Sequence, residues 1–164
     1  MSITGGHTKN ESNEILQLVS FNIGNEEFGV DILLVQEINK YVPITKVPNS
    51  PDFVEGVINL RGRVIPIVDL RTRLKMEKKE PDKDTRIIVV DLGQKTIGFI
   101  VDSVSEVLRI PANITETPPE LVSGIDSEFI KSVGKLDDRL LILIDLNKLL
   151  SKEETEKIGA INSY

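Results

Sequence analysis

Two aspartates in matching positions are the residues whose type and spacing come nearest to acid–base chemistry. Asp69 follows the apolar run Val64–Val68, and Asp145 follows the similar run Leu140–Ile144. A pair of carboxylates can act as general acid and general base, but each aspartate also starts a helix-like segment, "DLRTRL" or "DLNKLL". An aspartate in that position caps a helix by accepting hydrogen bonds from its first backbone amides. We therefore expect both residues to be helix caps.

Arg61 is the most distinctive charged residue, because it stands on a glycine turn in "NLRGR", directly before an apolar run. Its planar fork of donors suits the carboxylate or the helix end of a partner better than a lysine does. A solvated arginine on a hairpin is the plainer alternative. The residues alone leave both interpretations open.

Catalysis and metal binding have little support in the composition. The chain has no cysteine, and its one histidine, His7, lies in a polar stretch near the start. Gly5 and Gly6 precede this histidine, but no further copper ligands follow it. No phosphate-binding loop, serine hydrolase motif or dinucleotide fingerprint occurs in the sequence. We expect neither an enzyme nor a site for a metal or a cofactor.

The charge balance and the terminal segments narrow the class of protein further. Twenty basic and 26 acidic residues give a net charge of −6, which repels a nucleic acid backbone. Aromatic residues, which would stack on bases, make up 4% of the chain, so a nucleic-acid-binding small barrel is the disfavoured alternative. No run approaches the roughly 18 consecutive apolar residues of a membrane-spanning helix. We expect a cytoplasmic protein without membrane insertion, with a disordered tail over residues 1–14 that lacks the features of a signal peptide.

The chain contains the same pattern twice. The segment Leu18–Lys40 aligns without a gap to Ile87–Arg109, which lies 69 residues further on. Two later pairs of blocks keep the same order: "VEGV" resembles "VSGI", and Val64–Leu74 resembles Leu140–Leu150. Matching blocks in one order indicate an internal duplication.

Each half shows the signals of a short-stranded β structure. A hairpin signal comes first, with turns at Gly24 and Gly93, and an apolar strand comes last. Several short strands with glycine turns indicate a small closed barrel. Half of the chain is too short to bury a large core alone, so we expect two barrels packed face to face, with approximate halves 15–75 and 84–150. Residues 153–164 would add a polar tail or helix.

The duplication also separates residues that the fold needs from others. Positions that are alike in both halves are those that a barrel requires, such as Gly29 and Gly98, which we interpret as turn or close-approach positions. Arg61 has no counterpart in this comparison, because the second half runs on through "DSEFIKSVGKLDD" before its apolar strand resumes. By this criterion Arg61 is not a framework residue.

The segment "LVQEI" combines a glutamate with aliphatic neighbours. On a regular strand, Val35 and Glu37 share one face and Ile38 points to the other. Such a glutamate is either an exposed strand position over a core or part of a charge-selective contact strip for another protein. The sequence leaves both readings open.

Four segments together resemble the CheW family of chemotaxis coupling proteins: "FGVDILLVQEI", "VEGVINLRGRVIPIVDLR", "IGFIVDSVSEVL" and "RLLILIDLNKLL". The resemblance extends over residues 15–152, and the "GVINLRG…PIVDL" block is highly specific. It implies a mainly β fold of two SH3-like five-stranded barrels, related by internal duplication and packed around a shared hydrophobic core. Short helices and a polar C-terminal helix would complete this domain.

The resemblance also implies a role without chemistry of its own. CheW-like proteins are adaptors that couple the cytoplasmic tips of chemoreceptors to the histidine kinase CheA. The expected partners are the tip of a methyl-accepting chemotaxis receptor, the regulatory domain of the kinase, and further CheW copies in rings. The expected location is cytoplasmic, with recruitment to membrane-associated receptor arrays.

In this family the helical hairpin of the receptor docks in a groove between the barrels. Matching motif to motif, the resemblance implies receptor contacts at Val35, Glu37, Ile38, Gly56, Arg61 and Val107. It leaves open whether Arg61 touches the receptor or braces Glu37. For the kinase it implies Leu121, in "TPPEL", although burial of this leucine in its own barrel is the alternative.

Overall fold

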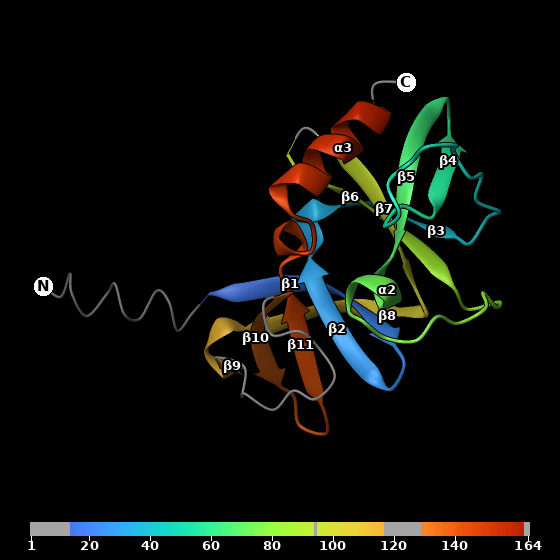
Figure 1. Ribbon diagram of the computed structural model, residues 1–164. Helices are drawn as coiled ribbons and strands as arrows, with labels where there is room; N and C mark the ends of the chain where they lie inside the picture. The colour runs from blue at the N-terminus through green and yellow to red at the C-terminus, as the bar shows by residue number, and fades with distance from the viewer. Residues whose placement is uncertain (1–13, 94, 117–128, 163–164) are drawn as a thin grey trace, which may run out of the picture.

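The computed structural model describes residues 14–93, 95–116 and 129–162, and these residues form two β-sheets with short helices beside them (Figure 1). One sheet has six strands and the other has five. Each sheet curves around apolar side chains of its own as an SH3-like barrel. The mainly β fold with two such units that the sequence predicted is therefore confirmed, except that one of the two sheets has six strands where five were expected.

The bounds of the elements are as follows. The six-stranded sheet contains β1 (Ile15–Ile23), β2 (Glu26–Asp31), β8 (Ser103–Pro111), β9 (Thr115–Glu116), β10 (Ile130–Lys135) and β11 (Leu140–Ile144). The five-stranded sheet contains β3 (Val35–Lys40), β4 (Gly56–Leu60), β5 (Arg63–Asp69), β6 (Arg86–Asp91) and β7 (Thr96–Val101). The helices are η1 (Ile32–Leu34), α2 (Leu70–Arg73), η2 (Ala112–Ile114), η4 (Leu146–Lys148) and α3 (Lys152–Asn162).

The two sequence halves exchange their first hairpins. The strand orders are β8-β1-β2-β11-β10-β9 and β3-β6-β7-β5-β4. The hairpin β1–β2 of the first half thus lies between β8 and β11 of the second, and β6–β7 lies between β3 and β5. Each exchanged hairpin joins its new sheet through a parallel contact, β2 with β11 and β7 with β5. In Figure 1 the blue β2 accordingly lies beside the red-brown β11. Neither sequence half forms a sheet alone.

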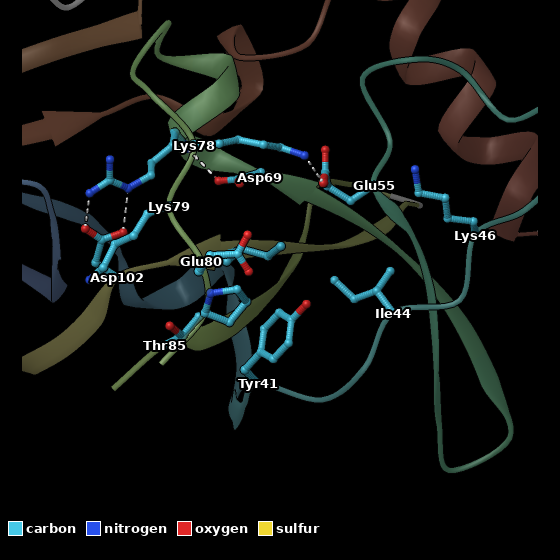
Figure 2. Close-up of a pocket in the computed structure, with 13 residues that line it drawn as sticks. Tyr41, Ile44, Lys46, Glu55, Asp69, Lys78, Lys79, Glu80, Thr85 and Asp102 are labelled. Atoms are coloured by element: carbon cyan, nitrogen blue, oxygen red, sulfur yellow. Dashed lines mark hydrogen bonds and ion pairs between the residues drawn. The ribbon is translucent and has the colours of Figure 1, made fainter. Parts of the chain in front are cut away.

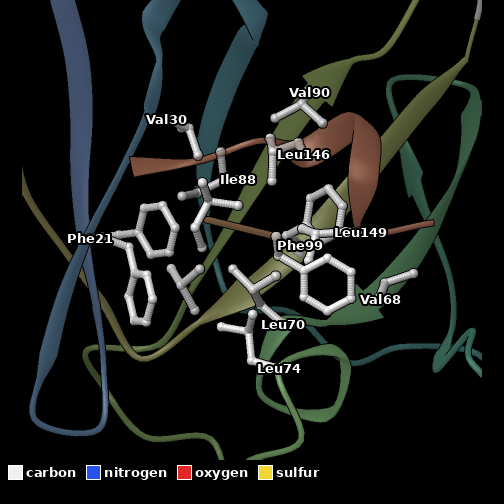
Figure 3. Close-up of a cluster of buried hydrophobic side chains, with 14 of the residues drawn as sticks. Phe21, Val30, Val68, Leu70, Leu74, Ile88, Val90, Phe99, Leu146 and Leu149 are labelled. Atoms are coloured by element: carbon white, nitrogen blue, oxygen red, sulfur yellow. The ribbon is translucent and has the colours of Figure 1, made fainter. Parts of the chain in front are cut away.

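The buried apolar side chains form three clusters. One belongs to the five-stranded sheet and consists of Ile58, Ile65, Ile67, Ile87 and Val89. One belongs to the six-stranded sheet and consists of Leu18, Ile110, Leu141 and Leu143. The largest cluster draws on both sheets and on the helices, and Figure 3 shows Phe21, Phe99, Leu70 and Leu149 within it. Because side chains alternate along a strand, neighbouring residues supply a barrel interior and the shared core in turn. The shared hydrophobic core is thereby confirmed.

Both predicted aspartate caps are confirmed. Oδ1 of Asp69 accepts from the amide of Arg71 at 3.0 Å, at the start of α2. Oδ1 of Asp145 accepts from the amide of Asn147, also at 3.0 Å, at the start of η4. The two aspartates therefore cap equivalent short helices, and each helix lies next to the shared core.

The paired glycines differ in how tightly they are packed. A Cβ atom at Gly98 would lie 2.6 Å from Cδ1 of Ile67, on the neighbouring parallel strand. At the equivalent Gly29 the nearest atom, Cδ2 of Leu141, would be 3.4 Å away. Gly24 and Gly93 have positive φ angles of 60° and 80°, as their hairpin turns require. The expectation of turn and close-approach roles is confirmed.

The C-terminal segment forms the helix α3, which packs against β5. Its residue Ile158 is buried in the shared core. Arg73, at the end of α2, donates to the carboxylate of Glu154 at 2.9 and 3.2 Å and to the carbonyl of Leu149 at 2.6 Å. These contacts fix the helix to the five-stranded barrel. Among the described residues, no helix has the length and apolar character needed to cross a membrane.

Candidate functional site

A β-bulge rearranges the candidate residues on the edge strand β3. Val35 pairs with Val90, but Glu37 pairs with Val89, so one extra residue lies between them. As a result Val35 and Ile38 both face the shared core, whereas Glu37 faces the interior side of the five-stranded barrel. The expectation that Val35 and Glu37 share one face was wrong, because it assumed a regular strand.

Ile38 and Val107 occupy equivalent positions and extend the shared core to the surface. Ile38 pairs with Ile88, and Val107 pairs with Val19; both partner residues are buried in the shared core. Ile38 is 40% exposed and Val107 is 56% exposed, which is unusual for aliphatic side chains facing a core. We call four residues on these two edge strands the seam residues: Val35, Ile38, Val104 and Val107.

Arg61 and Glu37 form an ion pair beside the seam residues. Arg61 has a positive φ of 52° at the tip of the β4–β5 hairpin, and Oδ1 of Asn59 accepts from the amide of Gly62 at 2.8 Å. This fixed turn directs the guanidinium to Glu37, whose carboxylate accepts from Nη2. The side chain of Arg61 is 73% exposed and that of Glu37 is 25% exposed. Arg61 therefore braces Glu37 and still has donors directed to solvent.

The tip of the β10–β11 hairpin is the counterpart of the turn that carries Arg61. The backbone closes over Leu136–Arg139 as it closes over Leu60–Arg63. The stretch "KLDDR" therefore corresponds to "NLRGR", and Asp137 stands where the first half has Arg61. The expectation that Arg61 has no counterpart was therefore wrong. The hairpin turn is repeated in the second half, but the residue at this position carries the opposite charge. The longer segment before β10 hid this match in the sequence.

Arginines also follow the turn in both hairpins, and sequence reasoning missed them. Nη2 of Arg63 donates to the hydroxyl of Thr96 at 2.8 Å. Nε of Arg139, the equivalent residue, donates to the carboxylate of Glu27 at 2.6 Å. Both arginines tie a hairpin to the strand of the exchanged hairpin, which identifies them as framework residues. The signal was present in the sequence, because each directly precedes the repeated apolar block.

Gly56 has a packing role inside the five-stranded barrel. It is buried at the start of β4 with a φ of 153°, and a Cβ atom there would lie 2.4 Å from the carbonyl oxygen of Thr45. Thr45 exchanges two backbone hydrogen bonds with Val57, of 2.9 and 2.8 Å. Gly56 thus lets the segment after β3 lie against β4. Leu121, the residue expected to contact the kinase, lies outside the described residues.

A polar cavity of about 330 Å³ lies under the loop after α2, away from the seam residues (Figure 2). Lys78 lies 2.7 Å from Glu55 across it, and Arg71 makes two hydrogen bonds to Asp102, of 2.9 and 2.6 Å. The amide of Gly24 also donates to Asp102, at 2.8 Å. These two charged pairs fasten the loop and the β1–β2 turn to the barrel.

Two aspartates at this cavity have shifted pKa values of opposite direction. Burial raises the pKa of Asp69, although the amide of Arg71 partly offsets the effect. Burial also acts to raise the pKa of Asp102, but the hydrogen bonds from Arg71 and Gly24 outweigh it and leave the pKa below its ordinary value. The fold therefore stabilises the ionised form of Asp102 and destabilises the ionised form of Asp69.

A second cavity, of about 750 Å³, lies at the other end of the molecule beside η1 and η4. Leu16, Ile32 and Leu146 line it, together with Leu33 at its rim. Leu33 is 87% exposed, the highest value among the large hydrophobic residues that the structure describes. This apolar surface is separate from the seam residues, none of which lines it. Within the described ranges, no group of three or more acidic or histidine side chains is arranged to hold a metal ion.

Comparison with known proteins identifies the family of this architecture. Residues 17–154 match the family model described as a CheW-like domain. Chemotaxis protein CheW of Klebsiella aerogenes is 44% identical over 138 residues, covering 84% of this chain and 83% of that protein. Chemotaxis protein CheW of Helicobacter pylori is 34% identical over 150 residues, with 92% and 90% covered. The crystal structure of the scaffolding protein TtCheW from Thermoanaerobacter tengcongensis superimposes with a TM-score of 0.75 at 44% identity, over 84% of this chain and 89% of that one.

Proposed function

The chain belongs to the CheW family, and we propose that it is a non-catalytic adaptor that couples chemoreceptor tips to the histidine kinase CheA. The observation that carries this proposal is the pair Ile38 and Val107, equivalent exposed aliphatic residues of the two barrels that pair with buried residues of the shared core. Exposed aliphatic side chains beside a held charge are typical of a protein contact surface.

The receptor tip would lie on the seam residues. A helical hairpin placed there covers Ile38 and Val107, and removal of this apolar area from water supplies binding free energy. Glu37, held by Arg61, would then stand at the edge of the contact in one fixed position. The exposed N–H groups of Arg61 would donate hydrogen bonds to a carboxylate or to the carbonyl end of a helix of the receptor. In this arrangement Arg61 both braces Glu37 and contacts the receptor.

The kinase contact would use a different surface. Leu33 and the partly apolar cavity beside it form an exposed surface that none of the seam residues lines. We assign this surface to the regulatory domain of CheA, and in rings also to contacts that recruit further copies of this chain. An adaptor with two separate contacts holds receptor and kinase together in the membrane-associated array.

Binding energy alone provides the mechanism. When receptor and kinase dock on one adaptor, the local concentration of each near the other rises, and the receptor conformation can bias the activity of the kinase. No residue of the chain needs to make or break a bond. The net charge of −6 also counts against the alternative of nucleic acid binding.

Reconstitution tests the proposed function. The purified chain is titrated into a mixture of a receptor cytoplasmic fragment and CheA, and autophosphorylation of the kinase is followed. We expect a change in kinase activity that requires all three proteins. The same titration without the receptor fragment should leave the kinase at its basal rate. An unchanged rate with all three proteins present would contradict the proposal.

A further inference from the structure

The two barrels present the same surface twice, but with opposite charge. Both surfaces consist of an edge strand and the tip of the hairpin beside it. Three positions of the five-stranded sheet have counterparts in the six-stranded sheet: Glu37 and Glu106, Ile38 and Val107, Arg61 and Asp137. The glutamate and the aliphatic residue are kept, whereas the arginine is replaced by an aspartate.

The hairpin tip on the five-stranded barrel carries the exposed positive charge of Arg61. Two arginines, Arg61 and Arg63, lie here against the carboxylates of Glu37, with which Arg61 pairs, and of Asp91, which is the cross-strand neighbour of Thr96. The side-chain partner of Arg63 is Thr96, which is neutral. An incoming carboxylate would therefore be attracted to this surface.

The surface on the six-stranded barrel has an excess of negative charge. Arg139 lies 2.6 Å from Glu27, 3.2 Å from Asp138 and 3.7 Å from Glu106, so one cation is shared by three carboxylates. Asp137 adds another carboxylate at the same hairpin tip. The neighbouring cation, Lys135, is engaged by Glu116 at 3.1 Å. An incoming basic side chain would be attracted here.

Glu106 is the carboxylate best placed to meet a partner. Its contact with Arg139 is long, at 3.7 Å, because Glu27 holds the guanidinium at 2.6 Å. Its side chain is exposed, and it directly precedes the seam residue Val107. Glu37 is by contrast held by Arg61 and mostly covered.

We propose that this difference in charge fixes the orientation in which the receptor helices lie across the seam residues, an inference that rests on the proposed function. The aliphatic positions alone are nearly equivalent, so they would accept a helical partner in either of two opposite orientations. A partner with a carboxylate toward Arg61 and a basic side chain toward Glu106 gains two favourable contacts. The reversed orientation places like charges together at both sites, which is costly.

Binding measurements with charge-changed variants give the first test. Isothermal titration of a receptor cytoplasmic fragment is carried out with the unaltered chain, Glu106→Gln, Glu106→Lys and the control Glu153→Lys, which makes the same charge change on exposed α3. We expect Glu106→Lys to weaken binding roughly tenfold at low salt, Glu106→Gln to weaken it less, and both effects to shrink at high salt. Glu153→Lys should stay within about twofold of the unaltered chain.

Site-directed labels give the second test, because the chain has no cysteine of its own. Lys40→Cys and Arg109→Cys place a photo-crosslinker at equivalent exposed positions of β3 and β8. We expect the two labels to capture different, non-overlapping segments of the receptor fragment. Adding Glu106→Lys should mix the two sets of captured segments.

The outcomes separate this inference from the proposed function. If the unaltered chain binds and Ile38→Ser abolishes binding, but Glu106→Lys binds as tightly as the unaltered chain, the orientation proposal is overturned and the adaptor function stands. Capture of the same segments by both labels overturns it as well. If the unaltered chain does not bind the fragment at all, both proposals fall.

Discussion

Arg61 holds the carboxylate of Glu37 across the 24 residues that separate them, from the tip of one hairpin to the edge strand of the same sheet. The contact depends on the positive φ of Arg61 and on the turn that Asn59 closes. A charged pair built on a strained turn at the rim of a barrel contributes little to folding. The backbone strain of this turn is explained if the ion pair serves the recognition of a partner protein.

Removing either member of this pair should separate stability from receptor binding. We expect Arg61→Ala and Glu37→Ala each to lower the free energy of unfolding by no more than about 1 kcal/mol, because the Arg61 side of the pair is 73% exposed to solvent. Binding of a receptor fragment should weaken clearly, while binding to CheA should be retained. Circular dichroism during urea unfolding and titration against each partner provide the measurements. An unfolded variant would show that the residue is structural.

Substitution of two exposed aliphatic residues, Ile38 and Leu33, should weaken binding to one partner each. Ile38→Ser should weaken receptor binding and leave CheA binding unchanged, because Ile38 is a seam residue. Leu33→Ser should weaken CheA binding and leave receptor binding unchanged. Val42→Ser is the matched control, since Val42 is 41% exposed, is not a seam residue and does not line the second cavity. Pull-down with each partner measures the effects; equal losses in both assays would argue against separate surfaces.

Asp102 should make the fold more stable at neutral pH than in acid. Its folded pKa lies below the ordinary value of 3.8, so its contribution is complete above that value and is lost as the pH falls through the folded pKa. We expect Asp102→Asn to lower the free energy of unfolding at pH 7 by about 2 kcal/mol, the scale of a charged hydrogen bond. The loss should be smaller at pH 3 than at pH 7 when urea unfolding is compared.

Asp69 provides a matched control of opposite sign. Its folded pKa is raised by burial, so the folded state holds the proton more tightly and stability falls as the pH rises from 3.8 through the folded value. Asp69→Asn keeps an acceptor for the cap of α2 and removes the buried charge. We expect it to be neutral or stabilising at pH 7. A large loss of stability there would show that the carboxylate charge itself is needed.

The two close-approach glycines should respond unequally to alanine. Gly98→Ala would force Cβ to 2.6 Å from Ile67 and 2.9 Å from Ile87, so the buried side chains must shift, at a cost of about 1–3 kcal/mol. Gly29→Ala places Cβ at an ordinary 3.4 Å from Leu141 and should change stability by less than about 1 kcal/mol. Thermal and urea unfolding of both variants check the difference. Similar losses would contradict the packing argument.

The sequence predicted the fold well where local signals agreed with tertiary structure. The aspartate caps and the glycine turns follow from patterns a few residues long, and the two-barrel architecture follows from the internal duplication. The exchange of hairpins was not visible, because strand order depends on contacts between segments distant in the chain. The facing of Val35 was misjudged for a related reason: the bulge at residues 35–37 appears only when β3 is set against β6.

The candidate site was predicted in part. "NLRGR" and "VQEI" identified Arg61 and Glu37, which the structure brings together as an ion pair, and their contact with a receptor stays a prediction. The counterpart of Arg61 was missed because residues 117–128 lengthen the second half and shift its last hairpin out of alignment. Leu33 was passed over, since a leucine in an apolar stretch gives no sign that it is exposed.

The exchanged hairpins have a consequence for any shorter version of this molecule. A polypeptide with a single copy of the repeat would have a gap in its sheet between the strands equivalent to β3 and β5. It could fill this gap only by exchanging its hairpin with that of a second copy of the same polypeptide. Such a molecule would form an intertwined two-fold dimer. In the present chain the linker through residues 76–84 joins the two repeats covalently, so the same exchange occurs within one polypeptide.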